Sequence, residues 1–222
     1  MKKSSIAIKN QAIKQPLEIN IWALMWAFLW GLLIFILVAR VVWLQQVSVV
    51  GASMEPNYYT NELLFVDQID KDFERGRVVA VYQDKTQAVD ANYLTRFQPG
   101  VRFLLKRIIG LPGEDIEIRG SQVIIYNDAY PEGAVLQEDY ISDSVKREMD
   151  RRNINLERQS IPKGEYYVMG DNRNNSSDSR DPQFGTFPDY AILGQEFVRA
   201  WPLETFHFYQ NVLPTYRFEP LN

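Results

Sequence analysis

An uninterrupted apolar run near the N-terminus constrains this chain more than any other feature. Residues 21–39, IWALMWAFLWGLLIFILVA, contain no charged side chain. A helix of this length, rising about 1.5 Å per residue, nearly spans a hydrocarbon core of about 30 Å. The apolar residues run all the way round such a helix, which favours a membrane span over a helix with one buried face. We therefore expect residues 19–44 to form a transmembrane anchor and the segment that leaves the membrane.

The charges before this run predict its orientation. Four lysines precede it: Lys2, Lys3, Lys9 and Lys14. Positive residues stay on the cytoplasmic side, so residues 1–18 should be a cytoplasmic tail and residues 45–222 an extracytoplasmic domain. A cleavable signal peptide is the alternative, but its apolar region is normally about 7–15 residues and ends near an Ala-x-Ala-like site, which does not follow closely here. The expected location is the cell membrane, crossed once, or a thylakoid or other energy-transducing membrane.

Composition excludes several chemistries. The 222 residues include no cysteine and one histidine, His207, so neither a disulfide nor a cysteine or histidine metal cluster is expected, and no cofactor is implied. The formal net charge is −4, and basic residues predominate in the first 40, so the body beyond them is more acidic than the whole. An acidic body argues against nucleic acid as the main partner.

Beyond Ser53 the pattern changes to short runs typical of strands, separated by turn residues. These runs lie at 62–69, 76–83, 102–109, 114–120, 121–128, 165–171 and 196–202. Residues 115–118 and 122–126 alternate around an Arg-Gly-Ser turn, as a hairpin does. Polar residues 83–100 and 132–160 are expected to be insertions, the second with a short helix. The predicted fold is mainly β, an antiparallel sheet domain behind a single N-terminal transmembrane helix.

Ser53, in the segment GASMEP, is a candidate nucleophile if a base can take its proton. His207 lies in ETFHFYQ, where aromatic neighbours favour a structural role. Lys106 lies in VRFLLKRIIG, and burial among apolar residues would lower its pKa enough for a base. Strand alternation puts Lys106 on one face with Leu104 and Ile108, and Arg107 on the other. An edge lysine that discourages aggregation is the alternative, and periodicity alone does not decide between them.

A polar segment, GDNRNNSSDSRDP at residues 170–182, completes the set of candidate motifs. Such residues often form a solvated loop in which side chains hydrogen-bond their own backbone. They are equally able to form a dense network of hydrogen bonds, in which Asp178 and Arg180 would pair.

Taken together, these segments resemble type I signal peptidases, membrane-anchored Ser/Lys proteases that remove signal peptides from exported proteins. The resemblance covers about residues 20–202 and rests on the anchor and on five motifs, GASMEP, ERGRVVAVY, FLLKRIIGLPGEDI, GDNRNNSSDSR and FGTFPDYAILGQEFVRAWP. It implies a β-rich catalytic domain outside the membrane, with Ser53 as nucleophile and Lys106 as general base through an acyl-enzyme. It also implies that Ser176 orients the lysine and that Asp178 and Arg180 organise the site.

Two positions depart from common members of that family. Gly51 stands where some members have a serine that helps to hold the oxyanion, so the backbone N–H of Ser53 would be a main donor. Arg77 stands where the family usually has aspartate, and we expect a scaffold role for it. The implied partners are the lipid bilayer and secretory precursors with small residues one and three positions before the cut. Met54 and Leu104 are candidates for their pockets.

Two other interpretations remain open. An anchored but non-catalytic β module that binds peptides would keep the fold while the side chains of Ser53 and Lys106 lay far apart. A self-cleaving repressor with a similar catalytic fold is disfavoured by the anchor and by the lack of a DNA-binding domain. A penicillin-binding enzyme is unlike this chain, because no Ser-x-x-Lys follows the anchor and Lys85-Thr86 is not followed by glycine.

Overall fold

The computed structural model describes residues 20–89, 91, 100–208 and 216–221. The expected tail, 1–18, and half of the expected insertion at 83–100 lie outside the described residues. The chain divides into two compact units, Met1–Leu37 and Val38–Asn222.

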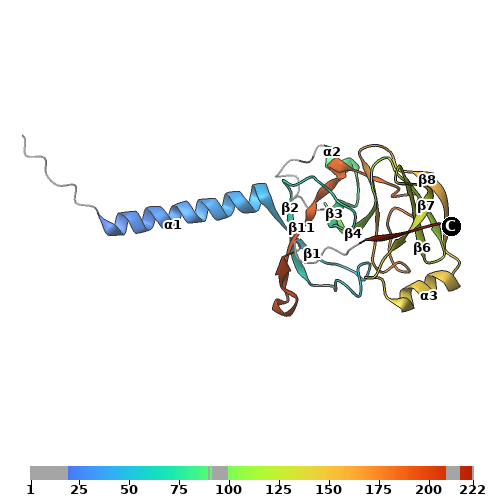
Figure 1. Ribbon diagram of the computed structural model, residues 1–222. Helices are drawn as coiled ribbons and strands as arrows, with labels where there is room; N and C mark the ends of the chain where they lie inside the picture. The colour runs from blue at the N-terminus through green and yellow to red at the C-terminus, as the bar shows by residue number, and fades with distance from the viewer. Residues whose placement is uncertain (1–19, 90, 92–99, 209–215, 222) are drawn as a thin grey trace, which may run out of the picture. The chain divides into compact units, whose positions relative to one another are not determined.

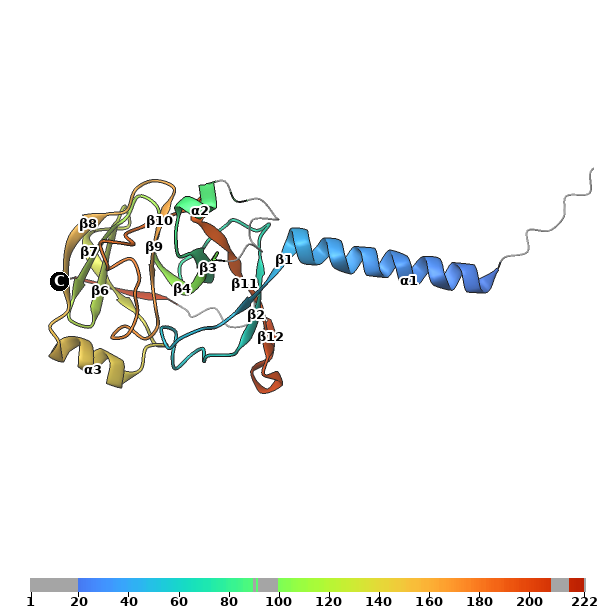
Figure 2. The same cartoon turned by 180° about the vertical axis from the view of Figure 1, so that it is seen from behind.

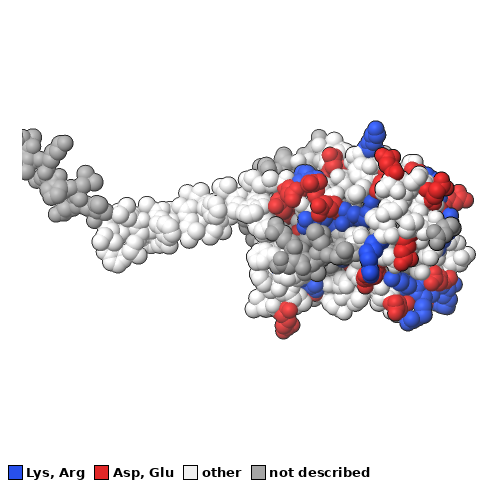
Figure 3. All heavy atoms as spheres, viewed as in Figure 1, with Lys and Arg blue, Asp and Glu red and all other residues white. Residues whose placement is uncertain are grey.

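The apolar helix α1, Ile21–Val38, belongs to the first unit except for its last residue. Its 18 residues have a mean hydropathy of 2.5, and none is buried, so by length and composition the helix can cross a membrane. The Asn20 side chain begins the helix by accepting hydrogen bonds from the N–H groups of Trp22 and Ala23. Figure 3 shows no charged side chain along α1. A π-helical turn, Ala39–Trp43, follows.

The second unit is built mainly from two antiparallel sheets (Figures 1 and 2). The larger sheet has the order β1-β2-β11-β3-β4-β9-β10, and β12 pairs with β11. Its strands are β1 Leu44–Ser48, β2 Leu63–Asp67, β3 Val78–Tyr82, β4 Phe103–Gly110, β9 Glu165–Met169, β10 Phe187–Pro188, β11 Ile192–Trp201 and β12 His207–Phe208. All five residues of β3 are buried, as expected for a central strand of apolar β-branched residues.

The smaller sheet has the order β13-β7-β6-β5-β8. Its strands are β5 Asp115–Arg119, β6 Gln122–Asn127, β7 Tyr130–Gln137, β8 Asn155–Ser160 and β13 Arg217–Pro220. The hairpin of β5 and β6 pairs Asp115 with Tyr126 and Arg119 with Gln122, around the turn expected from the sequence. Residues 132–160, expected as an insertion on one sheet, instead supply most of β7, the helix α3 (Asp143–Arg151) and β8 of this second sheet. The mainly β, antiparallel fold is as predicted.

Short elements complete the second unit. They are the helical turn α2, Thr86–Val89, and two 3₁₀ turns, Asp189–Ala191 and Leu203–Thr205.

Strand β4 connects three separate apolar clusters. Ile108 packs in the cluster under the larger sheet, Ile109 in the cluster of the smaller sheet, and Leu105 in a third cluster beside β1 and β2. The last six residues of β4 are all buried. A side chain on this strand is therefore held by packing on several sides, and Lys106 lies among these buried positions.

Candidate active site

Ser53 and Lys106 meet in the folded chain. Ser53 lies in the turns between β1 and β2, and Lys106 lies on β4, where β3 pairs it with Val79. The Nζ of Lys106 is 2.9 Å from Oγ of Ser53 and also donates to the carbonyl oxygen of Leu105 at 3.0 Å. The lysine is only 2% exposed, whereas Ser53 is half-buried. The pair therefore has the geometry of a nucleophile and its base.

The surroundings of Lys106 favour its neutral form. Burial lowers the pKa of its amine from the usual 10.5 to about 8, because desolvation penalises the ammonium. Asp178 and Asp171 oppose this by favouring the charged form, while Arg180 adds to the lowering. A pKa near 8 leaves about a tenth of the amine neutral at pH 7, which is enough for a general base.

The loop after β9 holds the serine segment from its carbonyl side. The backbone N–H of Asn172 donates to the carbonyl oxygen of Ser53 at 3.0 Å, and the Asn172 side-chain amide donates to that of Ala52 at 3.0 Å. Gly170 allows this approach, because a Cβ there would overlap both the Ser53 carbonyl oxygen and the Ser176 hydroxyl. Two hydrogen bonds from Asn172 thus restrain the backbone at Ala52 and Ser53.

Gly51 begins the turn that carries Ser53. Its φ of +87° is in the left-handed region, which glycine adopts without strain. Its N–H donates to the hydroxyl oxygen of Thr60 at 3.1 Å, and that hydroxyl donates to the Gly51 carbonyl at 3.2 Å. The position is exposed, with open space where a Cβ would stand. The departure from the family's serine is therefore matched by a backbone conformation that suits glycine.

Asp178 and Arg180 form the ion pair expected from the sequence. The guanidinium Nε and Nη2 each lie 2.8 Å from a different carboxylate oxygen of Asp178, and the Gly170 N–H donates to the same carboxylate at 2.9 Å. Burial alone would raise the pKa of the Asp178 carboxyl, but Arg180, the Gly170 N–H and the Ser176 hydroxyl lower it overall. Asp178 therefore stays an anion beside the dyad.

Ser176 lies next to this pair. Its hydroxyl oxygen is buried and makes no hydrogen bond of standard geometry among the described residues. It is nevertheless close enough to Asp178 to help lower the pKa of that carboxyl. Its expected part in orienting Lys106 stays a prediction.

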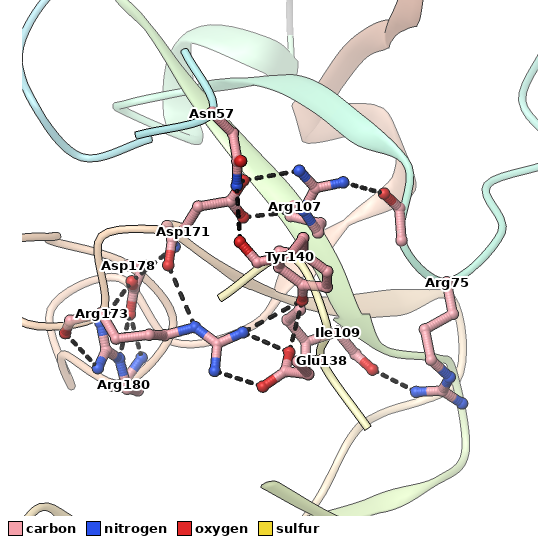
Figure 4. Close-up of polar contacts among 12 residues, drawn as sticks. Asn57, Arg75, Arg107, Ile109, Glu138, Tyr140, Asp171, Arg173, Asp178 and Arg180 are labelled. Carbon is pink, nitrogen blue, oxygen red and sulfur yellow. Dashed lines mark hydrogen bonds and ion pairs between the residues drawn. The ribbon is translucent and has the colours of Figure 1, made fainter. Parts of the chain in front are cut away.

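Sequence reasoning missed a second ion pair, between Arg107 and Asp171 (Figure 4). Arg107 points to the face of β4 opposite Lys106 and donates to both carboxylate oxygens of Asp171, at 2.8 and 2.6 Å. Its guanidinium also lies over the ring of Tyr140, 4.3 Å from the ring centroid. The amide of Asn57, four residues after Ser53, donates to Asp171 at 2.8 Å. This network joins the serine segment, β4 and the loop after β9.

A third buried ion pair, between Arg173 and Glu138, also holds the loop after β9. Arg173 donates to both carboxylate oxygens of Glu138, and the Tyr140 hydroxyl donates to Glu138 at 2.5 Å. The carbonyl oxygen of Arg173 in turn accepts a hydrogen bond from Arg180 at 2.7 Å. The three pairs are therefore linked through the loop, as Figure 4 shows. The Asp, Asn and Arg residues of this polar segment were the signal in the sequence, but nothing marked Glu138 and Tyr140 as their partners.

The two expected pocket residues have different surroundings. Met54 is 1% exposed and packs with Tyr58, Leu64 and Leu105 in the third apolar cluster. Leu104 is half-buried and lines a groove of about 560 Å³ that runs along β1 and the start of β4. Val50, three residues before Ser53, also lines the groove. Substrate contact by either residue stays a prediction.

His207 and Arg77 have partners other than the dyad. Nδ1 of His207 lies 2.9 Å from the carbonyl oxygen of Thr205, and its Nε2 lies 3.8 Å from Glu196. Arg77 pairs with Glu74 at 3.4 Å. Among the described residues, no group of three or more His, Asp or Glu side chains is arranged to hold a metal ion.

Comparison with known proteins identifies the family of the chain. The family model described as signal peptidase, peptidase S26, matches residues 21–201. A probable signal peptidase I-2 of Synechocystis is 34% identical over 69% of this chain, which spans 61% of that protein. Signal peptidase I P of Bacillus subtilis subsp. natto is 31% identical over 78% of this chain and 85% of its own length. A solved signal peptidase I of Enterococcus faecalis is 26% identical over 55% of this chain and 94% of its own, with a TM-score of 0.34. The extent of the family match and the length shared with the Bacillus protein show that the chain belongs to the signal peptidase family, peptidase S26.

Proposed function

We propose that this protein is a serine endopeptidase that removes N-terminal signal peptides from exported precursors, with Ser53 as nucleophile and Lys106 as general base. The observation that carries the proposal is the 2.9 Å contact between Lys106 Nζ and Ser53 Oγ in surroundings that lower the lysine pKa to about 8. A non-catalytic peptide-binding module has no need of a buried lysine beside a serine. The contact therefore favours the enzyme.

The chemistry follows from the pair. Ser53 Oγ attacks the carbonyl carbon of the scissile bond while neutral Lys106 takes the hydroxyl proton. The ammonium then gives this proton to the departing amine, which leaves an ester on Ser53. Lys106 next takes a proton from a water that attacks the ester, and the proton returns to Ser53 Oγ. The Ser53 N–H is the expected donor to the oxyanion, because no side chain at Gly51 can serve.

Two unpaired strand edges offer a place for the substrate beside the dyad. Within the described residues, β1 pairs only with β2, and residues 103–105 of β4 pair with β3 but with no strand on the other side. The groove lined by Val50 and Leu104 runs between these edges. An extended peptide would add as a strand, with main-chain hydrogen bonds on its edges and alternate side chains directed into the groove. Small side chains one and three positions before the cut would then face Lys106 and Leu104.

The helix α1 would hold the proposed protease at the membrane surface. We infer that α1 spans the membrane once, with residues 1–18 in the cytoplasm and the second unit on the outer side, because four lysines precede the helix. The scissile bond of a membrane-bound precursor lies near the bilayer surface. An anchored protease whose serine segment follows the span within about fifteen residues suits such a substrate.

The test is cleavage of a purified secretory precursor by the detergent-solubilised full-length protein, with the new N-terminus identified by mass spectrometry. We expect one cut at the signal junction. Precursors with a bulky residue such as Phe one or three positions before the cut should be cleaved at least tenfold more slowly, because shallow pockets reject them. Equal cleavage rates for precursors with small and with bulky residues at these two positions would contradict the proposed specificity. A folded protein that cuts no precursor would contradict the proposed activity.

A further inference from the structure

The groove lined by Val50 and Leu104 is also lined by one charged side chain among the described residues, that of Arg102. Six of its lining residues matter here: Gln46, Ser48, Val50, Gln83, Arg102 and Leu104. Its apolar lining residues are Val47, Val50, Phe103 and Leu104, and its polar ones are Gln46, Ser48, Gln83 and Arg102. Among the described residues, Arg102 is the one charged residue that lines the groove, so its guanidinium makes the electrostatic potential there positive.

The register of β4 puts Arg102 on the same face as Lys106 and Leu104. The ladder between β3 and β4 continues one residue beyond the strand, because the N–H of Gln83 donates to the Arg102 carbonyl oxygen at 2.9 Å. Side chains alternate along a strand, so positions 102, 104 and 106 share a face. At about 3.3 Å per residue, Arg102 lies about 13 Å along β4 from the general base.

The guanidinium of Arg102 is available to a ligand. Arg102 is exposed, and its side chain forms no ion pair or hydrogen bond with the described residues. It also lines a neighbouring pocket with Asp84, but that carboxylate accepts hydrogen bonds from the Thr86 N–H and hydroxyl, at 3.0 and 2.6 Å. In the part of the chain that the structure describes, no carboxylate lines the groove itself.

An extended peptide has the same repeat as β4. If the side chain one position before the cut faces Lys106 and the third faces Leu104, the fifth faces Arg102. We propose that Arg102 forms a third, electrostatic subsite that favours an acidic or neutral polar side chain five positions before the cut and disfavours lysine or arginine there. The inference rests on the proposed function, because the register is counted from the scissile bond.

The size of the effect follows from exposure. An exposed ion pair contributes little, so the preference for Glu over Gln, and for Gln over Lys, should be about two- to fivefold each in kcat/KM. Salt screens such a pair, so the preference should shrink as NaCl is raised towards 1 M. The fourth position before the cut faces away from the groove, so the same substitutions there should have a smaller effect.

The test uses the full-length protein and peptides that differ only at the fifth position before the cut, Glu, Gln or Lys. Wild type should cleave them in that order of kcat/KM, Arg102→Gln should make the three rates similar, and Arg102→Glu should reverse the order. Arg147→Glu is the matched control, because Arg147 is exposed on α3, outside the groove, and its substitution changes the net charge equally. Figure 3 shows basic side chains gathered where α3 lies. Arg147→Glu should keep the wild-type order.

The outcomes distinguish a failure of the proposed subsite from a failure of the proposed protease function. If the order persists in Arg102→Glu, or changes equally in Arg147→Glu, the subsite is wrong and the proposed protease function stands. If wild type cleaves none of these peptides and no precursor, the protease function is wrong and the subsite is wrong with it.

Discussion

Asn57 binds Asp171 across 114 residues of sequence, with its Nδ2 2.8 Å from Oδ2 of the carboxylate. The same amide lies 3.2 Å from the carbonyl oxygen of Tyr140, and Asp171 is at the same time paired with Arg107. The segment that carries Ser53 is therefore attached to the buried ion pair on the far face of β4. The position of Ser53 therefore depends on contacts on the opposite face of β4 as well as on its contact with Lys106.

Substitution Asn57→Ala should loosen this attachment. It removes two partly buried hydrogen bonds, so the free energy of unfolding in urea should fall by about 1–3 kcal/mol, and kcat should fall with it. The comparison is Asn155→Ala, because Asn155 is exposed and its loss should reduce stability by less than 1 kcal/mol. An equal fall in the free energy of unfolding in the two variants would show that the hydrogen bonds of Asn57 contribute no more than those of an exposed asparagine.

The pH dependence of cleavage should report the amine of Lys106. Its pKa is lowered to about 8 by burial, and only the neutral form accepts a proton from Ser53. Well below that pKa, kcat/KM should rise about tenfold per pH unit, and it should level off by about pH 9. A rate that is flat between pH 5 and 9 would count against Lys106 as the base. The control is the folded fraction measured over the same range.

Removal of the lysine charge should stabilise the fold. The folded pKa of Lys106 is below its unfolded value, so the unfolded state binds more protons between about pH 8 and 10.5, and stability rises with pH in that window. The penalty for burying the ammonium is fully present below about pH 8. Lys106→Met, which fills similar space, should therefore raise the free energy of unfolding at pH 7 by about 1–3 kcal/mol, while activity is lost.

The gain of Lys106→Met over wild type should also shrink as the pH rises from 8 to 10.5. A variant that is less stable than wild type at pH 7 would show that the Lys106 hydrogen bonds outweigh the desolvation of its amine.

The pair of Asp178 and Arg180 should behave as a coupled unit. Asp178→Ala leaves the Arg180 guanidinium and the Gly170 N–H without their carboxylate, and should reduce stability by about 3 kcal/mol. The double variant Asp178→Ala with Arg180→Ala should lose at least 1 kcal/mol less than the sum of the two single variants. Additive losses in urea unfolding would mean that the pair contributes no coupling.

Gly170→Ala should impair cleavage more than it impairs folding. The added methyl would overlap the Ser53 carbonyl oxygen and the Ser176 hydroxyl, so the two loops must move apart. A displacement of about 1 Å at the nucleophile is enough to reduce kcat by about a hundredfold. The measurement is kcat with KM followed separately, since the groove at Leu104 is not touched. Full activity would show that the loops can separate without moving the serine.

Local patterns explain how much of this structure was predictable. The hairpin of β5 and β6 was evident because its side chains alternate and Gly120, with a φ of +58°, stands in its turn. The apolar residues beside Lys106 made it a candidate base, but periodicity left an edge lysine equally open, and its assignment rested on the family resemblance. The role of residues 132–160 was not, because β8 is exposed at five of six positions and lacks an alternating pattern.

Contacts between distant segments explain the rest. The bonds from Asn57 to Asp171 and from Arg173 to Glu138 join residues that no local pattern relates. The surroundings of Met54 were not predictable either, because its neighbours in sequence do not indicate that it packs in the third apolar cluster. Such contacts depend on how the sheets pack. The periodicity of a single sequence does not predict that packing.

The most direct test of the account is cleavage of one precursor by four variants of the full-length protein. Ser53→Ala and Lys106→Ala remove the dyad, while Ser144→Ala and Lys163→Ala remove an exposed serine and an exposed lysine elsewhere. With all four variants folded, the account predicts that cleavage at the signal junction falls at least a thousandfold in the first two and stays within twofold of wild type in the others. Cleavage that survives in either Ser53→Ala or Lys106→Ala would contradict the Ser/Lys dyad.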